Sequence, residues 1–400
     1  MTTIQPQHQD WTVAWVAFVV ALFAWGAGFY GPAMFVHALH ASRGWSISLV
    51  GMAVTTHFLL SAVLVANLPR VHHRLGVTHA TLGGTGLLAV GIVAWAASPE
   101  AWLLFPAAAL TAAGWAATSG AAIHAIVAPR YGRTLPKALA IAFNGASAGG
   151  VLIAPLWAFL IAQTGLLAAA LVIGVGMVLI VIPLVWRFLY RRDTNARLLQ
   201  PLASTAPTPL DQPVSTLRLA LLRDPRFVSI SVAFAMGLFA QIGIFIHLVS
   251  HLATTLGIAG ASGAISLVTL CAVGGRTMLG WWVGSGSLRT LAAVNFIMQS
   301  VGVVVLAFAT WPPFVISGCI LFGLGVGNLI TLPPLIAHRD LPAAHVGTAV
   351  ALVTSINQAV FAFAPAMVGI ARDYFGDYSV AFALAAGLQL CAAMVVRRHR

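Results

Sequence analysis

Acidic side chains are scarce in this sequence, which has 8 Asp and Glu residues against 20 Lys and Arg in a chain of 400. Charged residues of both signs make up 7% of the chain and hydrophobic residues 60%, whereas about 25% of the residues in a soluble domain are charged. So few charges cannot give a folded chain a water-compatible surface. The shortage excludes an ordinary soluble globular protein and predicts a protein that lies in a lipid bilayer.

Cysteines and catalytic motifs are also scarce. Cys271, Cys319 and Cys391 fall within apolar runs, and their spacing matches neither a metal site nor an evident disulfide, so we interpret them as small buried residues. The sequence has no HExxH, GxSxG or Cys/His cluster, which are the patterns of common hydrolytic and metal-dependent sites. We therefore expect a protein that is not an enzyme and that has no cofactor and no metal.

Long apolar runs are what the sequence has in abundance. A membrane-crossing helix needs about 20 apolar residues, and backbone groups in hydrocarbon must bond within the protein, so runs of this length are expected to be helices. Twelve runs can be distinguished, near 12–39, 46–68, 80–97, 101–128, 137–163, 165–189, 226–250, 258–283, 287–309, 312–336, 346–371 and 376–396. The predicted fold class is an all-α membrane protein with twelve transmembrane helices, the first of them a retained helix and not a cleaved signal.

Basic residues are distributed unevenly along these runs. If both termini lie in the cytoplasm, 17 of the 20 Lys and Arg residues fall in cytoplasmic segments, and the exceptions are Arg43, Arg276 and Arg372. Such a bias is typical of inner-membrane proteins. We therefore predict a multi-pass protein of the cell inner (plasma) membrane with cytoplasmic N- and C-termini. We expect its large positive charge to set the orientation of the protein in the lipid bilayer and not to bind nucleic acid.

One long polar stretch divides the chain. Residues 190–224 contain four prolines and several Ser and Thr, a composition typical of a flexible linker. The stretch separates six apolar runs from the other six. The predicted organisation is an N-terminal six-helix bundle at 1–189, a cytoplasmic linker at 190–224 and a C-terminal six-helix bundle at 225–400.

The two halves carry weak internal repeats. Pro155 and Pro365 end similar Asn-containing segments and lie 210 positions apart, and the Leu-Phe-Ala triplet at 22–24 recurs 216 positions later at 238–240. Matches with nearly the same offset and in the same order indicate an internal duplication. The two bundles are therefore expected to be pseudo-symmetric.

The loop after the second run resembles a known signature. Between its second and third spans the major facilitator superfamily has Gly-x-x-x-Asp-Arg-x-Gly, and the segment from Pro69 to Gly76 is similar to it. Arg74 and Gly76 fit the signature, whereas Pro69 stands where Gly is usual and His73 where Asp is usual. The resemblance implies two bundles with the substrate between them near the bilayer midplane. The missing Asp argues against the cytoplasmic gate that this residue usually forms in the superfamily, but not against the fold.

A second set of motifs points to one branch of that superfamily. Gly44-Trp45-Ser46 resembles the Gly-Trp-Ser signature of monocarboxylate transporters, and the stretch 137–150 is similar to their fifth span. Taken with the related oxalate/formate exchangers, this resemblance implies a carrier of small carboxylates. It also implies a substrate-binding arginine in span 8, four residues before a glycine.

Arg276 is the charge that the sequence places inside a span. An arginine at a helix centre costs about 2.5–3.5 kcal/mol on insertion scales. The one acid within the ranges given above, Asp377, stands at the outer end of its span, so no acid is available in the interior of a span. We therefore expect the partner of Arg276 to be the carboxylate of the substrate, which a guanidinium can bind through two hydrogen bonds. The alternative is that the side chain snorkels to the cytoplasmic interface, roughly 10 Å away.

The position of Arg276 also fits the resemblance, because Gly280 follows it by four residues. In monocarboxylate transporters an Asp commonly precedes this arginine by four positions and takes part in proton coupling. Here that position is Ala272, so the coupling ion stays open. A proton would have to be carried by a histidine or by the substrate itself.

Other polar and aromatic residues lie on spans that face the central cavity in this fold. Packing or interhelical hydrogen bonding is the alternative role for each of them. The residues expected to bind substrate are Arg276, Tyr30, Phe29, Asn144, Gln241 and Asn357, and the candidates for proton coupling are His247 and His57.

These observations predict a secondary active transporter that moves a small monocarboxylate across the inner membrane by alternating access. Its expected partners are the carboxylate, the lipid bilayer and, as the candidate coupling ion, the proton, and it is expected to work as a monomer. The alternative is a drug or neutral-metabolite efflux permease of the same fold. An exporter of organic cations would need a buried acid, and a carrier of neutral solutes would not explain Arg276.

Overall fold

The computed structural model describes residues 10–190, 214–282 and 287–398, and these residues form helices and turns without any strand. Ten helical segments in this part of the chain are long and apolar enough to cross a membrane. One of them, Ala101–Tyr190, has 90 residues and would be about 135 Å long as a single helix, against a hydrocarbon core of about 30 Å. It turns back at Gly132–Thr134 and at Gly165. It therefore makes three crossings, and the predicted twelve-helix fold is confirmed.

Two glycines turn the chain where long helices change direction. Gly165 (φ 83°, ψ 169°) separates the fifth and sixth crossings, and Gly257 (φ 69°, ψ 171°) separates the seventh and eighth. This backbone region is accessible almost only to glycine. Both turns lie at boundaries between the predicted apolar runs, and glycine lets each turn be made within a single residue.

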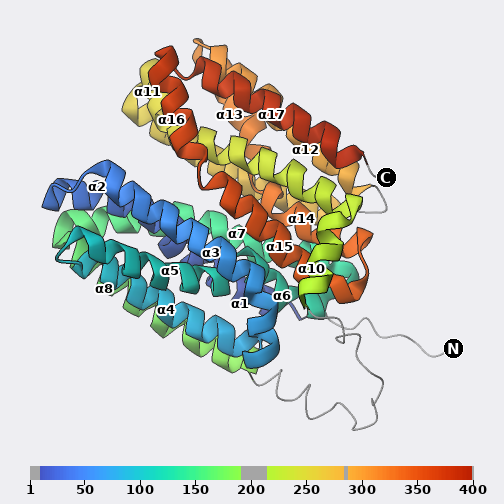
Figure 1. The fold of residues 1–400 in the computed structure, drawn as a ribbon. Helices are drawn as coiled ribbons and strands as arrows, with labels where there is room; N and C mark the ends of the chain where they lie inside the picture. The colour runs from blue at the N-terminus through green and yellow to red at the C-terminus, as the bar shows by residue number, and fades with distance from the viewer. Residues whose placement is uncertain (1–9, 191–213, 283–286, 399–400) are drawn as a thin grey trace, which may run out of the picture.

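The N-terminal bundle contains six crossings, drawn in blue to green in Figure 1. Its elements are α1 Thr12–Ala24, η1 Trp25–Phe29, α2 Tyr30–Arg43, α3 Ile47–Leu75, α4 Val77–Ala97, η2 Ala101–Leu103, α5 Leu104–Thr118, α6 Gly120–Tyr131, η3 Gly132–Thr134, α7 Leu135–Ala148, η4 Gly149–Ile153, α8 Ala154–Val185 and η5 Trp186–Tyr190.

The C-terminal bundle contains the other six crossings, drawn in yellow to red, and packs beside the first (Figure 1). Its elements are α11 Pro225–Trp282, α12 Leu288–Phe308, α13 Pro312–Val326, α14 Asn328–Asp340, α15 Ala343–Phe361, α16 Ala364–Phe375 and α17 Ser379–Arg397.

Part of the predicted linker is helical. Residues 191–213 lie outside the described part of the chain, but α10 (Val214–Arg223) follows them and packs on α11 and α15. The expectation of a flexible segment across all of 190–224 is therefore wrong for the ten residues of α10. The mixture of leucine and arginine in Leu217–Arg223 allows a short helix to pack one side on protein and to expose the other.

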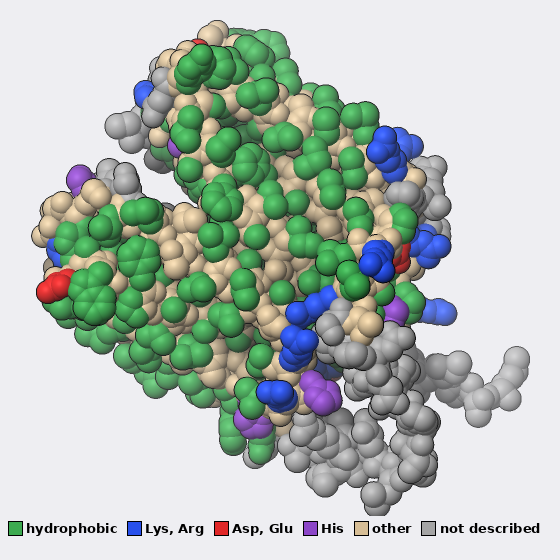
Figure 2. All heavy atoms as spheres, viewed as in Figure 1, with side chains coloured by type: hydrophobic (Ala, Val, Ile, Leu, Met, Phe, Trp, Pro, Cys, Tyr) green, Lys and Arg blue, Asp and Glu red, His purple; other side chains and the backbone are tan. Residues whose placement is uncertain are grey.

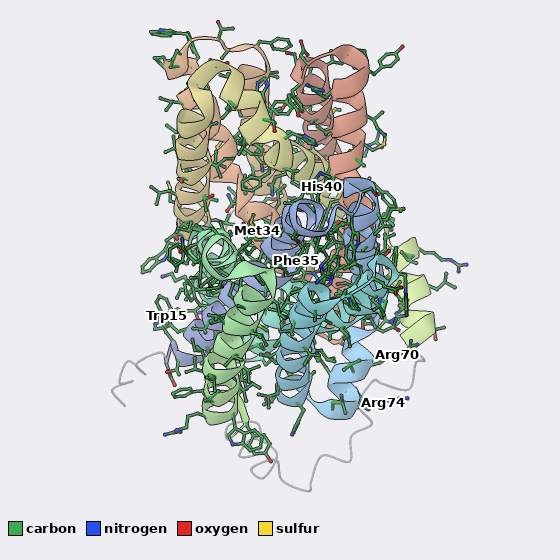
Figure 3. All side chains as sticks on the ribbon, turned by 90° about the vertical axis from the view of Figure 1, so that its left-hand side faces the viewer. Trp15, Met34, Phe35, His40, Arg70 and Arg74 are labelled. Atoms are coloured by element: carbon green, nitrogen blue, oxygen red, sulfur yellow. The ribbon has the colours of Figure 1, made fainter. Side chains whose placement is uncertain are left out.

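Basic side chains of the described surface are concentrated at one end of the bundles (Figure 2). We call this the basic end; α3 finishes there with Arg70 and Arg74 (Figure 3), α6 with Arg130 and α17 with Arg397, and Arg218 of α10 contacts α3 near the same place. The described chain begins and finishes at this end (Figure 1). The sides of the molecule in Figure 2 are covered by hydrophobic side chains. An apolar belt of this kind is expected of a protein surrounded by lipid.

The two bundles are in contact at the basic end and separated at the other. One buried apolar cluster runs through the N-terminal bundle and includes Phe227, Leu335 and Val350 of the C-terminal bundle, whereas a second cluster lies wholly within the C-terminal bundle. Figure 2 shows a hollow between the bundles at the end away from the termini, which we call the open end. The two bundles therefore enclose a hollow that is open at one end and closed at the other.

Candidate functional site: a cavity between the bundles

A cavity of about 120 Å³ lies between the two bundles. The N-terminal bundle contributes residues of η1, α2, α5, α6 and α7, and the C-terminal bundle contributes residues of α11, α13, α14 and α15. The lining residues are Trp25, Phe29, Tyr30, Trp115, Ser119, Gly120, Ala146, Ser147, Leu238, Gln241, Ile242, Phe245, Arg276, Val326, Leu329, Ile330, Pro333, Pro334, Thr354, Asn357, Gln358 and Phe361.

One wall of the cavity is aromatic. The rings of Trp25 and Trp115 meet edge to face with centroids 4.8 Å apart, and the ring of Phe29 stacks on Trp115 at 6.2 Å. Trp25–Phe29 is a single π-helical turn, three residues before Pro32. Proline cannot take part in the regular hydrogen-bond ladder, and a π turn is one way in which a helix accommodates this. The turn positions Trp25 and Phe29 against the cavity, as expected for Phe29.

Arg276 is buried in this cavity wall, with 2% of its surface exposed. Its Nε donates a hydrogen bond to the carbonyl of Gly327 (3.0 Å), and Nη1 donates to the carbonyl of Phe143 (2.6 Å), to Asn144 Oδ1 (3.1 Å) and to Ser147 Oγ (3.1 Å). Hydrogen bonds from a charged donor contribute about 1.5–3 kcal/mol each. The guanidinium of α11 thus holds α7 and the start of α14 together.

The sequence predicts the substrate carboxylate as the partner of Arg276 and does not reveal these four acceptors within the protein. Two of its acceptors are backbone carbonyls, which leave no trace in the sequence. All four acceptors are neutral, however, and no lining residue is Asp or Glu. Within the described residues, Arg289 and Asp340 form an ion pair (2.6 Å), and it lies at the basic end. The positive charge of Arg276 is therefore solvated but not neutralised, and it faces the cavity and not the membrane surface.

Three other polar side chains in the cavity wall carry buried atoms without a partner. Gln241 Oε1, Asn357 Oδ1 and Ser119 Oγ form no hydrogen bond within the described residues, and each side chain is at most 4% exposed. A buried polar atom left unpaired costs about 1–3 kcal/mol, and such atoms in native structures call for an explanation. Their position in the cavity wall makes them available to a bound molecule.

Ser119 was missed by the sequence reasoning. It lies between α5 and α6, where its extended backbone (φ −91°, ψ −159°) interrupts the fourth crossing. The signal was present, because Thr118-Ser119-Gly120 is a polar break inside an otherwise apolar run. Such breaks at membrane depth are tolerated where they are buried in protein or line a cavity.

The predicted binding residues divide into two groups. Tyr30, Phe29, Gln241 and Asn357 line the same cavity as Arg276. Asn144 is not among the lining residues, because its amide is engaged in the wall: Oδ1 accepts from Arg276, and Nδ2 donates to Thr277 Oγ1 (3.0 Å). Asn144 is therefore positioned to orient Arg276.

The two histidine candidates lie outside the cavity. His57 is fully buried inside the N-terminal bundle, with Nδ1 2.9 Å from Thr111 Oγ1 and Nε2 without a partner. His247 lies between helices of the C-terminal bundle, with Nε2 2.9 Å from the carbonyl of Pro365 and Nδ1 3.3 Å from Tyr378 Oη. Neither ring lines the cavity next to Arg276.

The arrangement matches a known family. The sequence model of the Major Facilitator Superfamily matches residues 16–365. The chain belongs to the major facilitator superfamily. It is therefore a transporter with the fold of that superfamily.

A solved superfamily structure shares the arrangement of the whole chain. An alanine variant of the E. coli fucose:proton symporter FucP superposes with a TM-score of 0.71 at 14% identity, over 96% of this chain and 97% of that one. At this identity the likeness concerns the fold. No curated protein sequence matches the chain.

Two sets of hydrogen bonds, which we call seams, join the bundles on the basic side of the cavity. In one, Arg276 and Thr277 of α11 bond to α7, as described above. In the other, Gln358 Nε2 donates to the carbonyl of Phe58 (2.9 Å) and to Ser61 Oγ (2.7 Å), and Ser355 Oγ donates to the carbonyl of Ala62 (2.6 Å). Both seams consist of hydrogen bonds to neutral groups.

The signature loop of the superfamily takes no part in these seams. His73, where the superfamily has Asp, is exposed at the end of α3, and Arg74 is exposed beside it. Neither residue forms an ion pair within the described chain. The side of the cavity that faces the basic end is therefore closed by residues of the cavity wall itself, Arg276 and Gln358 among them.

Proposed function

We propose that this major facilitator transporter carries a small organic monocarboxylate by alternating access. The observation that supports the proposal is the charge of the cavity: its lining residues include one cation, Arg276, and no Asp or Glu. A carboxylate entering the cavity would neutralise a charge that neutral hydrogen-bond partners only solvate. One cation suits one carboxylate.

The hydrogen bonds of Arg276 allow a substrate carboxylate to compete with the acceptors of α7 for the guanidinium. Nη2 forms no hydrogen bond within the described residues, whereas Nη1 is shared among three acceptors of α7. Charge-assisted hydrogen bonds to a carboxylate are about twice as strong as bonds between neutral groups. A bound carboxylate would draw the guanidinium away from α7, and this would weaken the seam that closes the basic side.

A neutral solute is the second candidate. Nε and Nη1 of Arg276 are already bonded to protein, and the rest of the wall offers aromatic rings with the amides of Gln241 and Asn357. Such a wall also suits a polyhydroxylated or apolar neutral molecule, and the structural neighbour is named as a fucose:proton symporter. This candidate corresponds to a permease for neutral metabolites or drugs.

We further propose the proton as the coupling ion, with His247 and His57 as the candidate carriers. Both nitrogens of His247 face oxygen atoms, so a doubly protonated ring would keep two acceptors. A doubly protonated His57 would bury an unpaired Nε2–H. His247 is therefore the stronger candidate. Loss of the pH dependence of uptake in His247→Gln, with uptake itself retained, is the expected result; an unchanged pH profile in both histidine variants would contradict this assignment.

The proposed setting is the inner membrane, with both termini in the cytoplasm and the transporter working as a monomer. The concentration of arginines at the basic end supports this orientation. The division into 1–189, 190–224 and 225–400 is proposed as the domain organisation. It follows the two bundles, with α10 assigned to the connecting segment.

A thermal-shift screen of the purified transporter tests the substrate class. Small monocarboxylates are expected to raise the melting temperature of the wild-type protein, and dicarboxylates, organic cations and neutral sugars to leave it unchanged. Arg276→Gln should abolish the shift, whereas Arg397→Gln, an exposed arginine at the basic end, should keep it. Uptake into proteoliposomes then follows for the best ligand.

The outcomes separate the two candidate functions. Stabilisation by neutral sugars that survives in Arg276→Gln would establish the neutral-solute carrier in place of the anion carrier. Stabilisation by monocarboxylates of equal size in wild type and Arg276→Gln would remove Arg276 from the binding site. Elution of Arg276→Gln as a single monodisperse peak shows that its behaviour is not caused by misfolding.

A further inference from the structure

The helix that precedes the C-terminal bundle joins the two bundles at the basic end. α10 packs on α11 and α15, and it lies across the bundle helices in Figure 1. From this position Arg218 Nη2 donates hydrogen bonds to the carbonyl of Ala66 and to Asn67 Oδ1, both near the end of α3. The connecting segment is thus tied to both halves of the transporter.

Two arginines converge at that contact. Arg70 Nη1 donates to Asn67 Oδ1 at 2.9 Å, and Arg218 Nη2 donates to the same oxygen at 3.0 Å. Burial, followed by the nearby charge of Arg70, lowers the pKa of Arg218 from its ordinary value. Like charges that share one neutral oxygen repel each other, and an anion beside them would relieve this repulsion.

No carboxylate of the described chain supplies that anion. Three acids of the described chain lie at this end of the molecule, and each is engaged elsewhere: Asp10 Oδ1 accepts from the backbone N–H of Thr12, Asp224 Oδ1 accepts from the backbone N–H of Arg226, and Asp340 pairs with Arg289. In addition, Arg218 Nη1 and Arg70 Nη2 form no hydrogen bond within the described residues, whereas Arg218 Nε is buried and is not open to a ligand. The cation pair therefore offers unused donors as well as unbalanced charge.

Exposed apolar side chains lie on the same two helices as the cation pair. Val63 and Leu64 of α3 are 61% and 40% exposed, and Leu219 and Leu222 of α10 are each 49% exposed. The burial of Leu221 (2%) shows which side of α10 packs on protein, so Leu219 and Leu222 belong to its outer side. Leucines flanked by arginines are typical of a helix that lies in the interface of a bilayer.

The height of the cation pair fits the headgroup layer. α3 has 29 residues and is therefore about 44 Å long, compared with about 30 Å for the hydrocarbon core. Arg70 and Arg74 lie on its final turns, and Figure 3 shows both on the part of α3 that extends toward the basic end. Val63 and Leu64, two turns earlier, lie at the depth of lipid chains.

We propose that Arg70 and Arg218 form a binding site for the phosphate group of an anionic phospholipid. The phosphate accepts hydrogen bonds from the free nitrogens of both guanidinium groups. The acyl chains of the lipid lie along Val63 and Leu64 of α3. Leu219 and Leu222 of α10 insert beside it. A lipid bound there supports the contact between α10 and α3, so the connection between the bundles depends on the lipid composition of the membrane. This site is separate from the central cavity and does not depend on the identity of the transported molecule.

Native mass spectrometry of the full chain in neutral detergent tests the site. Phosphatidylglycerol, phosphatidylcholine and inorganic phosphate are titrated separately, and the bound fraction and the melting temperature are recorded. Phosphatidylglycerol is expected to bind and to raise the melting temperature, in contrast to phosphatidylcholine and inorganic phosphate. Each arginine near an anionic lipid surface contributes about 1 kcal/mol, so Arg70→Gln should weaken binding roughly fivefold and Arg70→Gln with Arg218→Gln by roughly 25-fold.

Matched variants decide between this site and general charge attraction. Arg397→Gln removes an exposed arginine at the same end and should leave binding within twofold of the wild type. Because Arg218 also bonds to α3, the exposed Arg70 serves as the decisive single variant if the double variant does not fold. Equal binding of phosphatidylglycerol and phosphatidylcholine, equal losses in Arg70→Gln and Arg397→Gln, or stabilisation by inorganic phosphate alone would each overturn the proposal.

Discussion

Arg276 has two roles in the cavity wall. It lines the cavity, and it bonds α11 to Phe143 and Ser147 of α7 and to Gly327 before α14. A Cβ at position 327 would lie 2.9 Å from Arg276 Nη2, so glycine there makes room for the guanidinium. The planar guanidinium donates to several acceptors in fixed directions. The ammonium group of a lysine could not reproduce this geometry.

The unpaired amide atoms of the cavity wall allow a sharp prediction at the residue scale. Gln241→Leu removes a buried Oε1 that has no partner, so it should stabilise the empty transporter by roughly 1–3 kcal/mol while weakening the binding of substrate. Thermal melts with and without ligand measure both effects. Gln163→Leu, at an exposed position of α8, is the control and should change neither. A Gln241→Leu protein that is less stable when empty and binds ligand normally would show that the amide has a structural role.

At the scale of the helical elements, the turns between crossings are the most sensitive positions. Gly257 ends the seventh crossing at φ 69°, ψ 171°, a conformation that costs a residue with a Cβ about 1–3 kcal/mol. Gly257→Ala should lower the melting temperature. Gly263→Ala, six residues later in a helical conformation with open space around it, should be neutral or stabilising by up to about 1 kcal/mol. Equal destabilisation in both variants would indicate that packing, and not the backbone conformation, causes the loss of stability.

The seam between α7 and α11 yields a second prediction at this scale. A Cβ at Gly280 would lie 2.5 Å from Ala140 Cβ and 3.0 Å from the carbonyl of Pro136. Gly280→Val should therefore force the two helices apart and favour opening of the basic side. Ser61→Cys, buried in the other seam, reports this opening through its rate of reaction with a thiol reagent, in a background without Cys271, Cys319 and Cys391.

The control for this measurement lies on the same helix. Gly274 has open space within 4 Å, so Gly274→Val should leave the reactivity of Ser61→Cys unchanged, whereas Gly280→Val should increase it several-fold. Identical rates in the two variants would mean that the α7–α11 contact does not control the closed side.

At the scale of the whole molecule, the structure is closed at the basic end and hollowed at the open end. Phe245 lines the cavity and Ser61 is fully buried in a seam. In sealed proteoliposomes, Phe245→Cys should react with a membrane-impermeant thiol reagent added from the open side and not with one added from the basic side. Ser61→Cys should resist both. Faster labelling of Phe245→Cys from the basic side would show that the opposite conformation prevails in a bilayer.

The contact between the two bundles is concentrated at the basic end. At the open end the buried core of the C-terminal bundle is its own, and only at the basic end is the core shared. Two seams of neutral hydrogen bonds hold the bundles there, and α10 adds the contact of Arg218 with α3. Contacts of this kind can be exchanged for others at low cost, as a carrier that changes its open side requires.

The sequence by itself determined the number of crossings, the end at which the basic residues gather and the isolation of Arg276 among apolar runs. These features follow from the bilayer, which demands long apolar helices and excludes charge wherever it is not compensated. The placement of Tyr30, Phe29, Gln241 and Asn357 at the cavity also followed from the sequence, because the fold assigns their helices to its centre.

Only the tertiary structure decided which groups surround Arg276 and where the histidines lie. The carbonyl of Phe143 belongs to a helix 133 positions away from Arg276, and a backbone carbonyl has the same chemistry at every residue, so no sequence pattern identifies it. His57 and His247 lie on helices that also turn a side toward their own bundle, and the packing of each bundle directs both rings there. Contacts between distant residues depend on how helices rotate and pack against each other, and apolar runs that are hydrophobic on all sides leave that rotation undetermined.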